Sequence, residues 1–227
     1  MFHTLAHKHP HILRRIAVMM VVCTVMIVVA GCGTSSSDYA EKEEDKPIVR
    51  SWNERPAMEI DPSRKYSALV QTSKGSFEME LFAKEAPETV NNFVFLAKNR
   101  YYEGLSFHRI IETFMIQTGD PRGDGTGGPG YTIPDELNSD RKYEPGIVAM
   151  AKSLEPDSGG SQFFICTGVD SASLNMKPDY PIFGKVTSGM KVVEEIAKTP
   201  VEHQPVTGEY SKPTEVVTIE KISIRES

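Results

Sequence analysis

The sequence predicts a β-dominated domain, built either as a barrel or as a sandwich, behind a membrane-directed N-terminus. Between about residues 66 and 225, many short runs rich in β-branched and aromatic residues alternate with Gly, Pro and Ser. Only two segments of this range carry apolar residues at helical spacing. Short strands between turn residues, with few helices, are typical of barrels and sandwiches.

The N-terminus is a targeting segment rather than part of this domain. Residues 1–15 are basic, and residues 16–30 form an apolar run broken only by Cys23 and Thr24. As a helix this run would rise about 22 Å, which is short of the ~30 Å hydrocarbon core of a bilayer. A charged region followed by a short apolar region and small residues indicates a secretory signal.

The small residues Val29-Ala30-Gly31 are followed by Cys32. This tetrapeptide resembles the lipobox of bacterial lipoprotein signals, which implies a signal peptide over residues 1–31 and a diacylglycerol on Cys32. Two acyl chains give stable anchoring, so we expect an extracytoplasmic protein that is lipid-anchored to the bacterial cell membrane. The alternatives are an uncleaved signal anchor and an ordinary signal with an incidental cysteine.

Residues 32–65 follow the signal peptide and are predicted to form a flexible tether. Gly33–Lys46 is polar, rich in Ser and then acidic, so it lacks the apolar content to pack. Residues 47–65 hold three prolines and the only tryptophan, Trp52, and are interpreted as an irregular lead-in, with packing of Trp52 back onto the domain as the alternative. The folded domain is expected over residues 66–227.

The first elements of the domain are a hairpin and a helix. Two β-rich runs, 66–72 and 76–82, flank a turn that ends at Gly75, where positive φ is expected. A helix is predicted to begin near Pro87, whose missing N–H is tolerated there, and to end before Gly104. Later in the chain we expect strands over 107–111, 115–118, 146–151, 162–166, 182–186 and 216–224, and a second helix over 189–198.

Cysteine, histidine and charge limit the possible functions. Only Cys166 lies in the body of the chain, so neither a disulfide nor a cysteine zinc site can form there. His108 and His203 are the only histidines after the signal region, which argues against a Ser-His-Asp hydrolase or a multi-histidine metal centre. We expect no metal and no cofactor. The net charge of −6 makes the chain a poor nucleic-acid partner.

A glycine-rich stretch, Gly119–Gly130, is predicted to be a folded surface loop. It contains a G-x-G-x-x-G spacing, but Pro129-Gly130 follows, and this pair cannot open the helix that a dinucleotide site needs. An EF-hand is excluded because Tyr131 stands where the bidentate glutamate would be. Repeated glycines indicate several positive-φ positions instead.

The most informative stretch is Phe107–Gln117, in which Arg109 interrupts an apolar and β-branched run. A guanidinium is costly to bury without a partner, so Arg109 either pairs with a carboxylate or faces a ligand cleft. A surface-facing arginine on a half-exposed strand is the alternative. His108 alternates to the opposite side of the strand and is interpreted as a structural histidine.

Phe107–Gln117 and the second apolar stretch, Gly159–Cys166, together resemble the two signature stretches of the cyclophilins, the prolyl cis-trans isomerases. The similarity spans residues 66–225. It implies a closed eight-stranded antiparallel β-barrel capped by two α-helices. It also implies a prolyl isomerase without a cofactor. Together with the lipobox, this predicts action on proline-containing exported polypeptides, and we expect a monomer. A proline-peptide-binding chaperone or scaffold with little turnover is the alternative function, whereas a small-solute receptor is disfavoured because no second lobe is present.

The resemblance also assigns site residues. Arg109 and Gln117 match the catalytic positions, and Gly125–Gly128 matches the loop that flanks the substrate groove. Lys152 stands where the family usually has asparagine, and Tyr180 where it often has histidine. The substrate-binding positions implied by the resemblance are Phe114, Met115, Ala151, Lys152, Gln162, Phe164, Leu174 and Tyr180.

Overall fold

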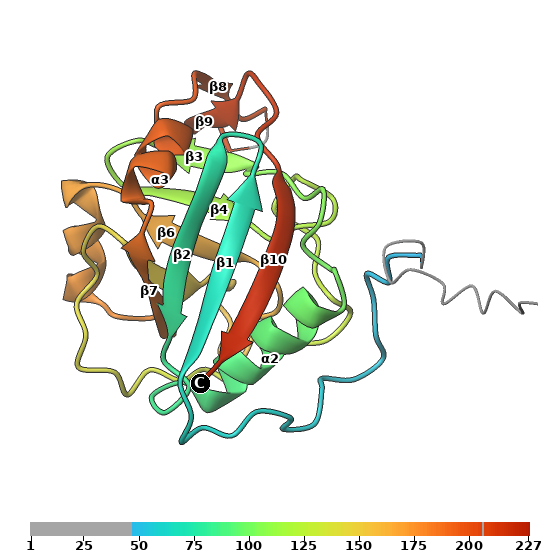
Figure 1. Cartoon of the computed structure of the whole chain (residues 1–227). Helices are drawn as coiled ribbons and strands as arrows, with labels where there is room; N and C mark the ends of the chain where they lie inside the picture. Colours follow the sequence, from blue (N-terminus) through green and yellow to red (C-terminus); the bar gives the residue numbers. More distant parts are fainter. Residues whose placement is uncertain (1–46, 206) are drawn as a thin grey trace, which may run out of the picture. The chain divides into compact units, whose positions relative to one another are not determined.

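The computed structural model of the chain describes residues 47–205 and 207–227. The predicted signal peptide, Cys32 and the first part of the tether lie outside these residues. Residues Pro47–Ser227 form one compact unit (Figure 1). Within the described residues, no helix is long and apolar enough to cross a membrane.

Eight antiparallel strands form one sheet that curls around a hydrophobic interior (Figure 1). The hairpin predicted at the start of the domain is confirmed, with Gly75 at a φ of +121° beside its turn. In spatial order the strands are β10 (Ile219–Glu226), β1 (Tyr66–Thr72), β2 (Gly75–Leu81), β7 (Ile182–Ser188), β5 (Ile147–Met150), β6 (Phe163–Cys166), β4 (Met115–Thr118) and β3 (Arg109–Ile111).

The sheet is a curled half-barrel, so the prediction of a closed barrel is wrong. The edge strands β10 and β3 do not pair along their length. The chain before β3 meets only the start of β10, through the bridge between Ser106 and Thr218 and backbone hydrogen bonds to Val217 and Ile219. The three-residue β3 is too short to form a second ladder, and its edge packs instead against β9 (Tyr210–Pro213). Because β9 covers the edge of β3, no further strand is needed to protect that edge.

Within residues 47–205 and 207–227, three helices accompany the sheet. The two predicted α-helices are confirmed as α2 (Pro87–Lys98), which packs along β10, and α3 (Met190–Ala197), which packs against β2 and β4. Pro87 stands at the first turn of α2, as its missing N–H requires. A 3-10 helix, η2 (Val169–Met176), was not predicted, because its polar sequence lacks an apolar period.

A second, two-stranded sheet also escaped prediction. It pairs β8 (Val201–His203) with β9, and we call residues 201–213 the C-terminal hairpin. The last strand of the main sheet begins at Ile219, three positions after the expected Val216, because the chain first returns from this hairpin.

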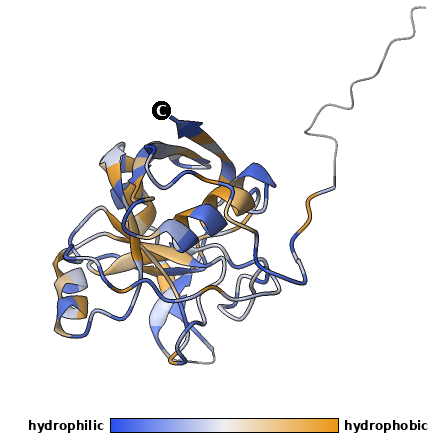
Figure 2. Cartoon of the chain, turned by 90° about the horizontal axis from the view of Figure 1, so that it is seen from below, coloured by the Kyte–Doolittle hydropathy of each residue, from blue (hydrophilic) through white to orange (hydrophobic). Residues whose placement is uncertain are grey.

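Hydrophobic side chains fill both faces of the part of the sheet that holds β3 to β6. Ile110, Ile116 and Ile165 lie opposite one another in the register and point into the interior, where they join the main core. The core is rich in aromatic rings, including Phe93, which packs edge-on against Phe163 at 5.5 Å. Figure 2 shows hydrophobic colour concentrated on the strands and hydrophilic colour on the connecting loops.

The lead-in segment, residues 47–65, is packed onto the domain, so the prediction of a flexible tether is wrong for this part. The Trp52 ring lies 5.2 Å from Phe95 and 6.0 Å from Tyr101 between ring centroids. The Trp52 N–H donates to the Pro129 carbonyl at 2.8 Å, and the Arg50 guanidinium donates to the Glu103 carbonyl at 2.7 Å. The compact unit therefore begins at Pro47 rather than at Tyr66.

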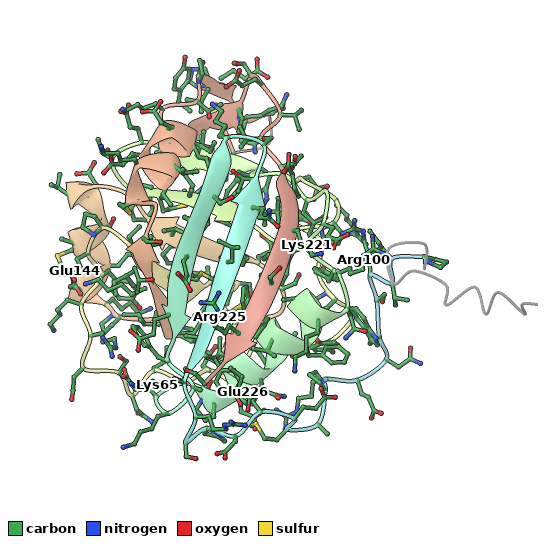
Figure 3. All side chains as sticks on the ribbon, viewed as in Figure 1. Lys65, Arg100, Glu144, Lys221, Arg225 and Glu226 are labelled. Atoms are coloured by element: carbon green, nitrogen blue, oxygen red, sulfur yellow. The ribbon has the colours of Figure 1, made fainter. Side chains whose placement is uncertain are left out.

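The outer face of β10 and its neighbours carries charged side chains. Figure 3 shows Lys221 and Arg225 among the side chains that project from this strand. Arg225 pairs with Glu78 at 3.6 Å across β1, and Arg64 pairs with Glu226 at 2.5 Å. Exposed pairs of this kind contribute roughly 0–1 kcal/mol each. The apolar part of the outer face lies at the other end of the sheet, over β3 to β6.

Candidate active site

The register of the sheet brings predicted site residues from three strands into one row. Arg109 on β3 lies opposite Gln117 on β4, and Gln117 lies opposite Phe164 on β6. Ala149 on β5 completes the row opposite Phe164. Directly paired residues point to the same face of a sheet, so this row faces away from the main core. The alternation that buries Ile110 inside thus turns Arg109 outward.

An apolar cluster lies on this outer face, separate from the main core, and we call it the groove cluster. Every apolar site residue predicted from the sequence belongs to it. Phe164 packs edge-on against Tyr180 with ring centroids 5.4 Å apart. The members of the groove cluster are Phe82, Met115, Tyr143, Ile147, Ala149, Phe164, Cys166 and Ile182, with Ile111, Phe114, Ala151, Leu174 and Tyr180 partly buried against them.

Phe114 is presented to the groove cluster by the turn between β3 and β4. The carbonyl of Phe114 accepts bonds from the Thr167 N–H at 3.1 Å and from the buried Ser171 hydroxyl at 2.7 Å. The Thr113 carbonyl accepts from the Asp170 N–H at 2.9 Å. A Cβ added at Gly168 would lie only 2.5 Å from the Thr113 carbonyl oxygen, so only glycine allows this close approach. η2 and the residues before it therefore fix the position of the Phe114 turn.

A row of polar contacts runs along the same face. The Arg109 Nη1 donates to Gln117 Oε1 at 3.4 Å, and Gln117 Nε2 donates to Gln162 Oε1 at 2.9 Å. Gln162 Nε2 in turn donates to the carbonyls of Gly125 and Gly127, at 3.0 and 2.9 Å. The amides of Gln117 and Gln162 thus connect Arg109 to the glycine-rich loop, which is held as part of the groove wall.

The guanidinium of Arg109 pairs with a carboxylate, which was one of the alternatives expected from the sequence, although the sequence did not identify the partner. Its Nε and Nη2 donate to the two carboxylate oxygens of Glu209 at 2.6 and 2.7 Å. The hydrogen bonds from Arg109 keep the pKa of the Glu209 carboxyl below its ordinary value. The Arg109 Cζ lies 5.9 Å from the centroid of the Phe114 ring. Arg109 therefore stands between a carboxylate and the apolar groove.

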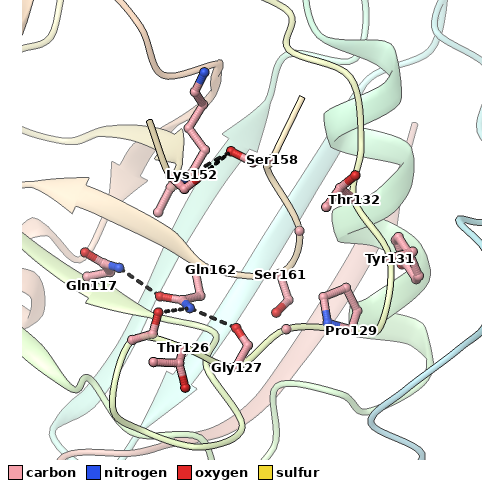
Figure 4. Close-up of a pocket in the computed structure, with 15 residues that line it drawn as sticks. Gln117, Thr126, Gly127, Pro129, Tyr131, Thr132, Lys152, Ser158, Ser161 and Gln162 are labelled. Atoms are coloured by element: carbon pink, nitrogen blue, oxygen red, sulfur yellow. Dashed lines mark hydrogen bonds between the residues drawn. The ribbon is translucent and has the colours of Figure 1, made fainter. Parts of the chain in front are cut away.

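A pocket of about 430 Å³ lies beside the groove cluster (Figure 4). Gln117, Ala151 and Gln162 contribute to both the pocket wall and the site, and the glycine-rich loop forms another wall. The Lys152 side chain extends away from Gln162 in Figure 4. Its ammonium pairs with Asp135 at 2.6 Å, and only 3% of the side chain is exposed. Lys152 therefore lines the pocket without offering it a free cation.

The remaining candidate groups are structural. His108 is buried, and among the described residues its two ring nitrogens have no hydrogen-bond partner. Burial lowers the pKa of its imidazole, which favours the neutral form. Burial also raises the pKa of the Cys166 thiol to about 11, so this cysteine is an inert member of the groove cluster.

Two charged residues of the site, Asp135 and Glu209, could not be assigned from the sequence. Glu209 lies 100 residues from Arg109, and its segment was not interpreted as a hairpin. The signal that was available is Gly208 between two short runs of alternating polarity, a pattern typical of a hairpin turn. Asp135, the partner of Lys152, carries no local signal in the sequence.

The fold and the site define a curled β-sheet domain that carries an apolar cluster on its outer face, with Arg109 at the edge of that cluster. Residues 67–224 match the family model described as "Cyclophilin type peptidyl-prolyl cis-trans isomerase/CLD". Because this match covers most of the chain, the protein belongs to the family of cyclophilin-type peptidyl-prolyl cis-trans isomerases, and it is an enzyme of that class.

Individual relatives agree with this assignment. A peptidyl-prolyl cis-trans isomerase of Helicobacter pylori is 46% identical over 132 residues, which is 57% of this chain and 78% of the relative. A peptidyl-prolyl cis-trans isomerase-like 1 protein of Aspergillus niger is 46% identical over 143 residues, covering 60% and 86%. The crystal structure of a cyclophilin-type isomerase from Cryptosporidium parvum superposes with a TM-score of 0.64 at 31% identity, covering 72% of this chain and 99% of that one.

Proposed function

We propose that this enzyme isomerises X-Pro bonds in exported polypeptides, and that Arg109 provides the group that stabilises the twisted amide. The observation that carries the proposal is the position of Arg109. Its Nη1 lies 3.5 Å from the sulfur of Met115, at the edge of the groove cluster. A permanent cation with a donor directed at an apolar groove suits a substrate whose charge distribution changes during rotation.

The chemistry requires no nucleophile. Rotation about the peptide bond removes its partial double-bond character and faces a barrier of about 18–20 kcal/mol. A catalyst must therefore bind the twisted amide more tightly than either planar form. In the twisted state the prolyl nitrogen becomes pyramidal and gains a lone pair. A hydrogen bond from Arg109 to this nitrogen exists only in that state, so it lowers the barrier rather than the energy of the bound substrate.

The groove cluster supplies the binding energy for the proline ring. Phe114, Met115, Phe164 and Leu174 lie together and offer an apolar surface to a pyrrolidine ring. The Gln117 carbonyl oxygen accepts from Arg109 while its amide nitrogen is bonded to Gln162, which favours an orienting role for Gln117. The adjoining pocket of about 430 Å³ has room for substrate residues that flank the proline. A structure of the Cryptosporidium parvum relative in the presence of an Ala-Pro dipeptide supports a proline ligand.

The location outside the cytoplasm rests on the N-terminal sequence. The basic region, the short apolar run and Cys32 after small residues support export and lipid anchoring. Since the compact unit begins at Pro47, residues 32–46 would join the anchor to the enzyme. We expect the anchored enzyme to act as a monomer on unfolded chains that emerge at the outer face of the membrane.

A test in cells distinguishes this foldase from a binding chaperone. The chromosomal copy is replaced by Arg109→Ala, and the yield of folded exported proteins is measured. A foldase loses its cellular role, whereas a chaperone that only binds keeps most of it. Cys32→Ser is the companion variant for location. It should abolish the incorporation of labelled fatty acid that the wild type shows while leaving isomerase activity unchanged, and incorporation that persists in the variant would contradict lipidation at Cys32.

A further inference from the structure

The donors of the Arg109 guanidinium are divided between two directions. Nε and Nη2 face Glu209, and each donates to a different oxygen of the same carboxylate, at 2.6 and 2.7 Å. Nη1 faces the opposite way, toward Met115 and Gln117, at the longer distances of 3.5 and 3.4 Å. A bidentate arginine–carboxylate pair fixes the plane of the guanidinium as well as its place. Glu209 therefore determines which nitrogen is left for the groove.

The backbone of the C-terminal hairpin holds Glu209 in this position. The Glu209 carbonyl accepts from the Gln204 N–H at 2.7 Å, and the Glu209 N–H donates to the Thr207 hydroxyl at 3.2 Å. The hairpin ladder then pairs His203 with Tyr210, directly after Glu209, and β9 packs against β3. The carboxylate thus comes from a braced segment that contacts the strand carrying Arg109.

The Glu209 carboxylate does not cover the side of the Arg109 guanidinium that faces the groove cluster. An inhibitory contact would cover the donor directed at the groove cluster, which is Nη1. Glu209 instead takes Nε and Nη2, and 30% of the Arg109 side chain remains exposed. Glu209 therefore supports the Arg109 guanidinium and does not block its Nη1 donor.

We propose that Glu209 is a positioning residue of the isomerase, which holds the Arg109 guanidinium so that Nη1 is presented to the prolyl nitrogen. The inference rests on the proposed role of Arg109. Preorganisation of this kind acts on the twisted state, because only that state uses the aimed hydrogen bond. It leaves binding of the planar substrate to the groove cluster, whose members do not include Glu209.

The test compares Glu209→Ala with Glu202→Ala in the full chain. Glu202 is the matched control because it lies on the same hairpin and pairs with Lys212 at 2.8 Å, away from Arg109. We expect Glu209→Ala to lower kcat for an X-Pro peptide about tenfold, the middle of the range for coupled neighbours. KM should stay within about twofold of the wild-type value, since the variant leaves the contacts that bind the planar substrate unchanged. Glu202→Ala should keep the wild-type kcat.

Further variants distinguish positioning of Arg109 by Glu209 from a general loss of structure. Glu209→Gln retains one acceptor without the charge, so it should recover part of the kcat lost in Glu209→Ala. Thermal unfolding of both variants confirms that the comparison is made on folded protein. In an Arg109→Ala background, Glu209→Ala should change kcat no further, because the residue acts through Arg109.

Two results would overturn the inference. Wild-type kcat in Glu209→Ala would mean that Gln117 and Met115 suffice to aim the guanidinium. A higher kcat in that variant would make Glu209 a brake. If Arg109→Ala alone keeps full activity, the proposed role of Arg109 fails first, and the experiment thereby separates failure of the two proposals.

Discussion

The close approach at Gly168 offers a sharp test of how the site is built. An alanine Cβ at this position would lie 2.5 Å from the Thr113 carbonyl oxygen and 2.7 Å from its Cα. Gly168 has a φ of −146°, which any residue adopts, so the effect of Gly168→Ala is steric and owes nothing to backbone strain. The obstructing atoms are backbone, so they can yield only if the turn that presents Phe114 moves.

The expected penalty follows from this geometry. Overpacking of a fitted contact costs about 1–3 kcal/mol. For a domain of this size, each kcal/mol lowers Tm by about 2–4 °C. We therefore expect Gly168→Ala to unfold roughly 2–12 °C below the wild type. Because Phe114 shifts with the turn, kcat/KM for an X-Pro peptide should fall as well.

The measurement is thermal unfolding followed by circular dichroism, with an isomerisation assay on the same samples. Gly128→Ala is the matched control, because a Cβ there meets nothing within 4 Å and its φ is not positive. That variant should keep the wild-type Tm or rise slightly. If Gly168→Ala also keeps its Tm and activity, the turn is not held as tightly as described.

Two further predictions concern pH. His108 has a lowered pKa in the folded protein, so below about pH 6.5 the unfolded chain takes up a proton that the folded chain resists, and stability falls on acidification. His108→Leu should remove this contribution to the pH dependence of stability. The urea midpoint of the variant minus that of the wild type should therefore be larger at pH 5.5 than at pH 7.5. An equal difference at the two pH values would refute the assignment. Arg109 stays charged, and the pKa of Glu209 is lowered, so their ion pair is lost only when the pH falls through that lowered value. We therefore expect kcat/KM to vary little from about pH 6 to 9, whereas a steep fall on the acid side of pH 6.5 would implicate His108 instead.

The strands and the apolar part of the site could be predicted because local patterns specify them. The alternation in Phe107–Ile111 places Arg109 and His108 on opposite faces, and the structure confirms this for the buried His108. The β1–β2 hairpin follows from Gly75 beside its turn, and the α-helices follow from apolar residues at helical spacing, with Pro87 in the first turn of α2.

The features that could not be predicted depend on contacts between distant segments. Glu209 meets Arg109 across 100 residues, and Trp52 meets Tyr101 from outside the predicted domain. The residue pattern around Glu209 or Trp52 does not indicate which distant residue each one contacts. Closure of the sheet is also a long-range property, because it depends on whether β10 reaches the three-residue β3.

The central claim is that this chain isomerises X-Pro bonds through Arg109. The most direct test measures the isomerisation rate of an X-Pro peptide with residues 47–227, the compact unit, with Arg109→Ala alongside. We expect clear acceleration by the wild type that is mostly lost in the variant. No acceleration by a folded domain that still binds proline peptides would contradict the account and would make the groove a binding site without turnover.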